Sequence, residues 1–251
     1  MSNMNSNTNK AEIELLISEM GMSPLSAKEY SDLMGFVGKI IITDAKLVNE
    51  YCSTYQKRVA DLSNQVTELI MDTHKISDTL NICRSVLHCI DDYHHYKEET
   101  TNSSLIRIEY EHTEKEIRSF KRRLNTNLVQ LEDNLNSFNS FRDSIQKCSY
   151  WICMYILGGK IKLKQVDDLL IAFRNGDLSR IKNYESAVIV MNSQNAFEKK
   201  LSSLSTSKAL CSQLFASIEM EIKNIQEDIS SINSVLNSTI PAFEQERSRI
   251  S

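Results

Sequence analysis

The stretch from Val48 to Ile90, VNEYCSTYQKRVADLSNQVTELIMDTHKISDTLNICRSVLHCI, decides the fold. Apolar residues recur along it at alternating spacings of four and three, which is the heptad pattern of a coiled-coil seam. The seam positions are Val48, Cys52, Tyr55, Val59, Leu62, Val66, Leu69, Thr73, Ile76, Leu80, Cys83, Leu87 and Ile90. Charged residues such as Lys57 and Asp61 occupy the flanking positions. The pattern therefore predicts one long helix that packs along this stripe.

Two further seams follow in the sequence. The second is Tyr110, Thr113, Ile117, Phe120, Leu124, Leu128, Leu131, Leu135, Phe138, Phe141 and Ile145, and the third is Phe197, Leu201, Leu204, Cys211, Leu214, Ile218, Ile222, Ile225, Ile229, Ile232 and Leu236. The polar stretch 94–104 predicts a connecting loop, and Pro241 predicts the end of the third helix. Helices this long must pack on one another or on a partner chain. We therefore predict an all-α fold, an elongated antiparallel bundle of long coiled-coil-like helices.

The beginning of the chain carries weaker signals. Residues 1–10 are polar and Asn-rich, which predicts a disordered tail without the features of a signal peptide. A short helical stripe, Ile13 to Met20, ends at a glycine and a proline. Ser26, with Glu29 three residues later, predicts a capping box at the start of the next helix.

Composition narrows the classes of function. The 251 residues include two prolines and six glycines, which favours long helices over a fold with many turns. The net charge is −4 with acids and bases interleaved, so we expect no nucleic-acid partner. The six cysteines show no paired metal spacing and fit buried positions in a reducing environment. Cytoplasmic synthesis is expected, and release by a signal-independent route followed by association with a target membrane remains an alternative.

One segment, Cys148 to Phe173, breaks the helical pattern. From Tyr150 to Leu157 it is apolar without alternation, and it contains the one tryptophan of the chain before a Gly-Gly pair. A second apolar burst begins at Val166, after three closely spaced lysines. We therefore divide the chain into a first bundle part (11–147), an apolar insert in the form of a short hairpin or tongue (148–182) and a last bundle part (183–251).

The apolar insert allows three interpretations. Trp, Tyr and Lys around an apolar centre are typical of a membrane-interface element. Neither burst approaches the roughly 20 apolar residues of a spanning helix. The insert could instead be a buried plug where the helices turn, or a surface for a partner protein.

Signals of catalysis are absent from the sequence. It contains no phosphate-binding loop, nucleophile elbow or zinc-protease motif, so we expect neither an enzyme nor a cofactor. His88, Asp92 and His95 share one helix face and could hold a metal such as zinc, but a functional site normally needs a fuller set of ligands, oriented by supporting residues. We interpret them as polar groups near a helix end and predict no metal site.

In layout the chain resembles the cytolysin A and xenorhabdolysin type of α-helical pore-forming toxins, in which an apolar tongue interrupts long antiparallel helices. That resemblance implies a toxin, or one subunit of a multi-component cytolysin, that forms homo- or hetero-oligomers with a related helical subunit on a lipid membrane. The hinge or turn of the tongue would be Gly158 and Gly159. The membrane-contacting residues would be Trp151, Ile152, Met154, Tyr155, Ile156 and Leu157.

A second class of function fits the same pattern. The chain could be a non-enzymatic cytoplasmic coiled-coil scaffold or tether whose seams bind a partner helix. The apolar insert would then stay buried. Binding to lipid distinguishes the two classes, because a scaffold should ignore it.

Overall fold

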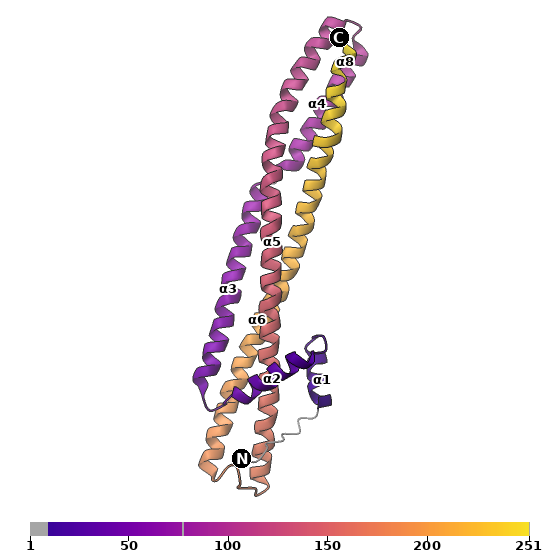
Figure 1. The fold of residues 1–251 in the computed structure, drawn as a ribbon. Coiled ribbons are helices and arrows are strands. Elements are labelled where there is room, and N and C mark those ends of the chain that lie inside the picture. The colour runs from indigo at the N-terminus through magenta and orange to yellow at the C-terminus, as the bar shows by residue number, and fades with distance from the viewer. Residues whose placement is uncertain (1–9, 77, 251) are drawn as a thin grey trace. The chain divides into compact units, whose positions relative to one another are not determined.

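The computed structural model describes residues 10–76 and 78–250, and all regular structure within them is helical. The elements are α1 (Lys10–Glu19), α2 (Ala27–Lys39), α3 (Ala45–Lys75), α4 (Thr79–Glu99), α5 (Ser103–Arg174), α6 (Tyr184–Ser234), the π-helical η1 (Val235–Thr239), α7 (Ile240–Gln245) and α8 (Arg247–Ile250) (Figure 1). The prediction of an all-α fold built from long helices is confirmed. The predicted tail, 1–10, falls almost wholly outside the described residues, as does the side chain of Val48.

The chain forms two compact units, each assembled from separate stretches of sequence. Unit 1 comprises residues 1–63 and 144–215, and unit 2 comprises residues 64–143 and 216–251. The chain passes from one unit to the other inside α3, α5 and α6.

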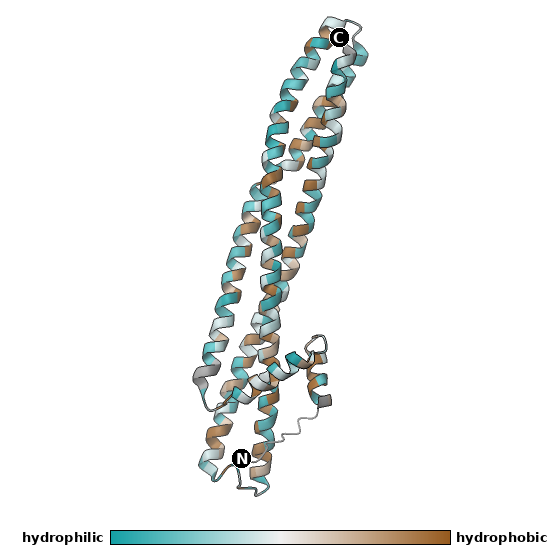
Figure 2. Cartoon of the chain, in the orientation of Figure 1, coloured by the Kyte–Doolittle hydropathy of each residue, from teal (hydrophilic) through white to brown (hydrophobic). Residues whose placement is uncertain are grey.

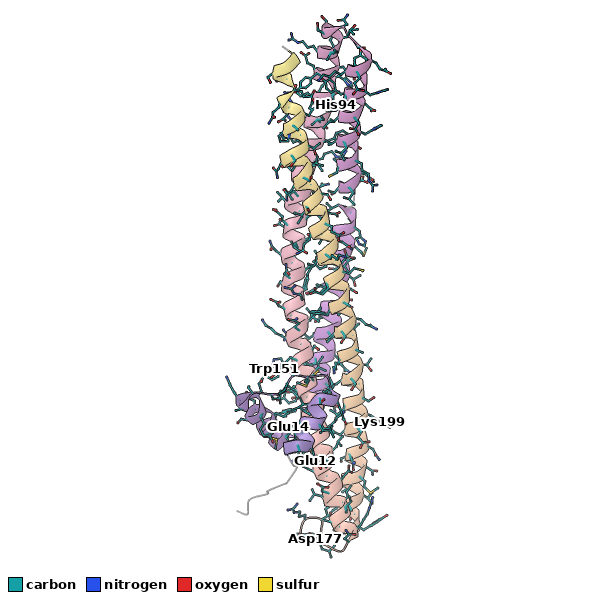
Figure 3. All side chains as sticks on the ribbon, turned by 90° about the vertical axis from the view of Figure 1, so that its right-hand side faces the viewer. Glu12, Glu14, His94, Trp151, Asp177 and Lys199 are labelled. Carbon is teal, nitrogen blue, oxygen red and sulfur yellow. The ribbon has the colours of Figure 1, made fainter. Side chains whose placement is uncertain are left out.

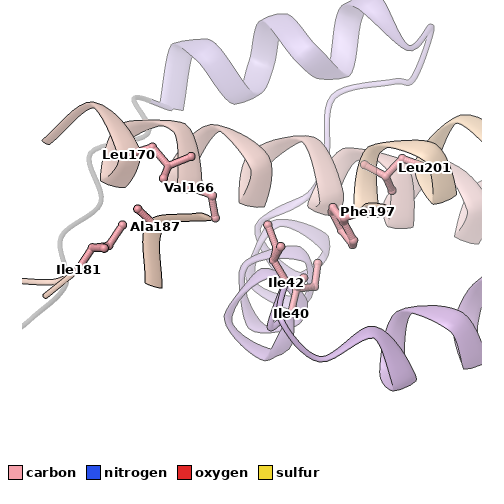
Figure 4. Close-up of a cluster of buried hydrophobic side chains, with 8 residues drawn as sticks. All are labelled: Ile40, Ile42, Val166, Leu170, Ile181, Ala187, Phe197 and Leu201. Atoms are coloured by element: carbon pink, nitrogen blue, oxygen red, sulfur yellow. The ribbon is translucent and has the colours of Figure 1, made fainter. Parts of the chain in front are cut away.

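The core of unit 1 lies where α5 and α6 pack together near their connecting loop. Val166 and Leu170 of α5 lie close to Ala187 of α6 and to Ile181 of the loop (Figure 4). The segment after α2 adds two isoleucines, and α6 adds an aromatic ring and a leucine. These four side chains are Ile40, Ile42, Phe197 and Leu201. Apolar side chains from three separate stretches are thus buried against one another, and this burial of apolar surface is the main contribution to the stability of the unit.

A second cluster in unit 1 joins α1 and α2 to α5. Ile13 and Leu33 are buried there against Leu157 of α5. Figure 2 shows hydrophobic residues on α5 where α2 crosses it. The start of α2 has the predicted capping box, since Ser26 Oγ accepts from Glu29 N at 3.3 Å and Ser26 N donates to Glu29 Oε2 at 2.8 Å.

Unit 2 contains a helix break that the first seam does not predict. The single helix expected up to Ile90 is wrong, because α3 stops before residue 76 and α4 starts at Thr79. Beyond the break the predicted seam positions Cys83 and Ile90 are buried. Leu80 and Leu87 are 40% and 44% exposed, and the residues before them, Thr79 and Val86, are buried instead. Because Leu80 and Leu87 directly follow these buried residues, the sequence shows an unbroken heptad spacing although the two leucines are exposed.

Two asparagines of α5 bond to the two sides of this break. Asn134 Nδ2 donates to Thr73 Oγ1 at 2.9 Å, and Asn127 Nδ2 donates to Thr79 Oγ1 at 2.9 Å. Both threonine hydroxyls in turn donate to carbonyls of their own turn of the chain. The polar groups at the break are therefore paired by α5.

The C-terminal part of unit 2 continues past the proline that was expected to end it. Ile240 N donates to Val235 O, five residues back, which is the geometry of a π-turn. Pro241 has no N–H to donate to a carbonyl of the preceding turn. The wider π-helical turn accommodates the proline, and helical structure continues to Gln245. The end predicted near Pro241 is therefore too early.

An aromatic cluster holds this end of the chain in place. The Tyr93 ring contacts the rings of Tyr110 and Phe243 at centroid distances of 5.7 and 5.4 Å.

The loop predicted at 94–104 is shorter in the structure and covers only residues 100–102, because α4 extends to Glu99. The helical extension brings His94 to Glu246, with Nε2 2.8 Å from Oε1.

Candidate functional site

The apolar segment from Cys148 to Phe173 is a continuous part of α5 within unit 1. It has neighbours on several sides, because α1 and α2 cover Leu157, the Tyr51 ring of α3 lies 4.7 Å from the Tyr155 ring, and Leu201 of α6 lies against Gly159. A helix that is apolar all round is a helix buried all round. Residues 152–159 are buried except for the half-buried Tyr155, which explains why alternation is missing there, whereas Trp151 and Ile171 are exposed.

The six residues predicted to contact a membrane are mostly inside unit 1. Trp151 is 47% exposed and lies on the side of α5 near α2 (Figure 3). Tyr155 is half-buried in contact with Phe36. The other four are 5% exposed or less: Ile152, Met154, Ile156 and Leu157.

The hinge or turn expected at Gly158 and Gly159 is not a turn in the structure, because both residues lie inside α5. A Cβ at Gly158 would lie 2.7 Å from Phe36 Cδ1, and a Cβ at Gly159 would lie 2.5 Å from a methyl group of Leu201. The glycines serve close packing of α5 against α2 and α6. A Gly-Gly pair is a common turn signal, and only the tertiary neighbours distinguish the two uses.

A groove at the start of α3 carries the most distinctive chemistry of unit 1. Its volume is about 340 Å³. It is lined by Ile42, Thr43, Asn49, Asn192, Ser193, Ala196, Phe197 and Lys200. We call it the Lys200 groove. Three of the lining side chains are apolar, and the polar ones supply two amides, two hydroxyls and one ammonium group.

The polar lining of the Lys200 groove favours an anion. None of the lining residues is acidic. Lys200 supplies a positive charge with three N–H donors, and Asn49 and Asn192 supply neutral amide donors. The N-terminal end of α3, between Thr43 and Asn49, adds the partial positive charge of a helix dipole. Lys199, the neighbouring lysine, is not among the residues that line the groove.

A buried thiol lies behind the groove. Phe197 lines both the Lys200 groove and a small apolar cavity that also contacts Cys52. Burial raises the pKa of the Cys52 thiol, and the positive charge of Lys200 partly opposes that shift. The charge of Lys200 thus acts on the interior of unit 1 as well as on the groove.

The residues of the Lys200 groove were not predicted from the sequence. The groove combines the segment before α3 with a stretch of α6 about 150 residues later, and periodicity does not report such a meeting. A weak signal was present, because Ser193, Ala196 and Lys200 are spaced to share one helix face beside the third seam.

The histidine cluster on α4 forms only local pairs. His88 Nε2 lies 3.6 Å from Asp92 Oδ2, and His95 Nε2 lies 3.3 Å from Glu99 Oε1. These side chains are largely exposed. Among the described residues no three His, Cys, Asp or Glu side chains are grouped so that they could hold a metal ion.

The model of the toxic anion resistance protein (TelA) family matches residues 33–248. The chain belongs to this family. The match includes every residue of the Lys200 groove and most of both units. No curated protein and no solved structure matches the chain.

Membership of the TelA family corrects the functional interpretation of the sequence. The resemblance to cytolysin A and xenorhabdolysin-type toxins is wrong, and the predicted function as a pore-forming toxin or cytolysin subunit falls with it. In the described part of the chain no helix is both long and apolar enough to cross a membrane. A layout of long helices around an apolar segment does not by itself indicate a function, because one kind of fold can serve many functions.

Proposed function

We propose that this protein contributes to resistance against toxic anions by binding an oxyanion in the Lys200 groove. The observation that carries the proposal is a cavity lined by Lys200 and neutral donors without any carboxylate. Membership of the toxic anion resistance family supports it, since the matched region contains the whole groove.

The chemistry of the groove suits an oxyanion better than a cation or a neutral metabolite. A deprotonated oxyanion offers only acceptor oxygens, and hydrogen bonds between them and an ammonium group are charge-assisted. The amide groups of Asn49 and Asn192 and the hydroxyl groups of Thr43 and Ser193 add donors around it. The volume of about 340 Å³ exceeds that of a small oxyanion and leaves room for its bridging waters.

Equilibrium dialysis of the full chain against tellurite or selenite tests the proposal. We expect saturable binding that sulfate weakens by competition. Lys200→Met should weaken binding about tenfold or more, because a charge-assisted hydrogen bond and the ion's main counter-charge are lost. Lys199→Met is the matched control and should bind as the unmodified protein does.

Two results would overturn the proposal. The first is no binding of either oxyanion at millimolar concentration by a protein with intact helical content. The second is an equal loss of binding in both lysine variants, which would show a general effect of net charge. Growth of cells in tellurite gives the physiological readout, with Lys200→Met expected to lower survival and Lys199→Met expected to preserve it.

Other expectations from the sequence stay predictions. They are the absence of enzymatic activity, the absence of nucleic-acid binding and assembly with the same chain or a related helical subunit. Anion binding is compatible with each of them, because the groove lies within unit 1 of a single chain.

A further inference from the structure

The register between α5 and α6 in unit 1 is fixed by two contacts. Gln194 Nε2 donates to Asp167 Oδ1 at 2.8 Å. Further along, Gly159 of α5 lies against the side chain of Leu201 of α6. The glycine lets the two helices approach closely at that point.

The same register brings two cysteines together. Cys148 lies about three helical turns from Gly159, and Cys211 lies about three turns from Leu201, in the corresponding direction along the antiparallel helix. Both thiols are free, and both residues are 1% exposed. The two thiols interact directly across the interface between the helices.

The charges around the pair differ for the two sulfurs. A hydrogen bond from the Cys211 thiol lowers the pKa of Cys148, and the positive charge of Arg58 on α3 acts in the same direction. Together these two effects outweigh burial, and the pKa of Cys148 falls to about 7. The same interaction, together with burial and the nearby Cys153, raises the pKa of Cys211. Tyr55 of α3 is a further titratable group that interacts with Cys148. One thiolate beside one thiol is the arrangement from which a disulfide forms.

We propose that Cys148 and Cys211 are a redox-active pair that forms a reversible disulfide between α5 and α6. The oxidant is a low-molecular-weight disulfide. The Cys148 thiolate attacks one of its sulfurs, forms a mixed disulfide and releases one thiolate, which takes up a proton. Cys211 then loses its proton and attacks the sulfur of Cys148, which releases the second thiol. Two protein thiols are oxidised, and one external disulfide is reduced to two thiols.

Burial sets the conditions of this reaction. Because both residues are 1% exposed, the oxidant reaches them only when unit 1 opens locally. The pair therefore oxidises more slowly than an exposed thiol. Once formed, the disulfide is shielded from reductant and ties α6 to α5.

Thiol counting and peptide mapping of the full chain test the proposal, with oxidised glutathione as the oxidant. The number of titratable thiols in denaturant should fall from six to four, and dithiothreitol should restore six. Mass spectrometry of the oxidised protein should show a peptide pair linked through Cys148 and Cys211, in a monomer that has lost two hydrogen atoms.

Single substitutions provide the controls. Cys148→Ala and Cys211→Ala should each prevent the loss of two thiols. Cys153→Ala, on the same helix and also buried, should allow it. A linkage of Cys153 to Cys211, a linkage between two chains, or a wild-type protein that keeps all its thiols free would each overturn the proposal. The wild-type peptide map decides the question even if a variant folds poorly.

Discussion

Glu246 shows how one side chain can secure the end of a chain. Its carboxylate is 2.8 Å from both Lys97 Nζ and His94 Nε2 of α4. Burial alone would raise the pKa of Glu246, but the hydrogen bonds and charges of Lys97 and His94 outweigh burial and lower it. The carboxylate is therefore more stable as an anion in the folded protein than in the unfolded chain.

Glu246→Gln should make unit 2 less stable at neutral pH by about 2 kcal/mol, because charge-assisted hydrogen bonds are lost. The folded pKa lies below the unfolded one, so this contribution is present above the unfolded pKa and lost as pH falls through the folded pKa. The difference between wild type and variant should therefore vanish in acid. Urea unfolding of both proteins at pH 7 and at successively lower pH measures this difference.

Glu244→Gln is the matched control for this residue. Glu244 lies two positions earlier and pairs with Lys121 at 3.0 Å, but both side chains are well exposed. An exposed pair contributes little to stability. If Glu244→Gln lowered the stability of unit 2 as much as Glu246→Gln does, the burial of Glu246 and its two contacts with α4 would not have the role assigned to them.

Helices in this protein are determined partly by local signals and partly by their neighbours. Ser26 and Glu29 form the capping box that the sequence predicts, since both partners lie within one turn. The break between α3 and α4 was not predictable in the same way. Its polar groups bond to Asn127 and Asn134 of α5, which lie about 50 to 60 residues away in the sequence. Heptad spacing detects a stripe along a helix, but it does not detect partners supplied by another helix.

The Gly-Gly pair in α5 gives a test of packing at the scale of elements. Gly158→Ala should lower the stability of unit 1 by about 1 kcal/mol, because overpacking costs more than the gain in helix propensity. The added Cβ would meet the Phe36 ring, which is also held by Tyr155 at a centroid distance of 4.3 Å. Thermal unfolding followed by circular dichroism measures the change.

Gly35→Ala, in the middle of α2, is the control for helix propensity. A Cβ there meets nothing within 4 Å, so the variant should be more stable by about 0.5–1 kcal/mol. If Gly158→Ala stabilised the protein as Gly35→Ala does, α5 and α2 would not be in the close contact described.

At the scale of the whole molecule, the sequence predicts the helices better than their assembly. The second and third seams are buried or half-buried at every position, so their faces followed from periodicity. Periodicity did not predict the two compact units or the Lys200 groove, because each combines stretches that are far apart in the chain. The apolar run around Trp151 was recognised as unusual, but its cause is burial by α1, α2, α3 and α6. Composition alone does not distinguish such burial from contact with lipid.

The connection between α5 and α6 should be the first site of proteolysis, and cutting it should not separate the molecule. Arg180 and Lys182 are exposed in the non-helical stretch before α6, where trypsin can bind an extended chain. A cut there yields one fragment ending near residue 182 and one beginning there. Each unit contains segments from both fragments, so the nicked protein should elute as a single species in size-exclusion chromatography. Denaturant should release the two fragments. Arg180→Gln combined with Lys182→Gln should delay the cut, whereas native separation of the fragments would contradict the division into units built from both halves of the chain.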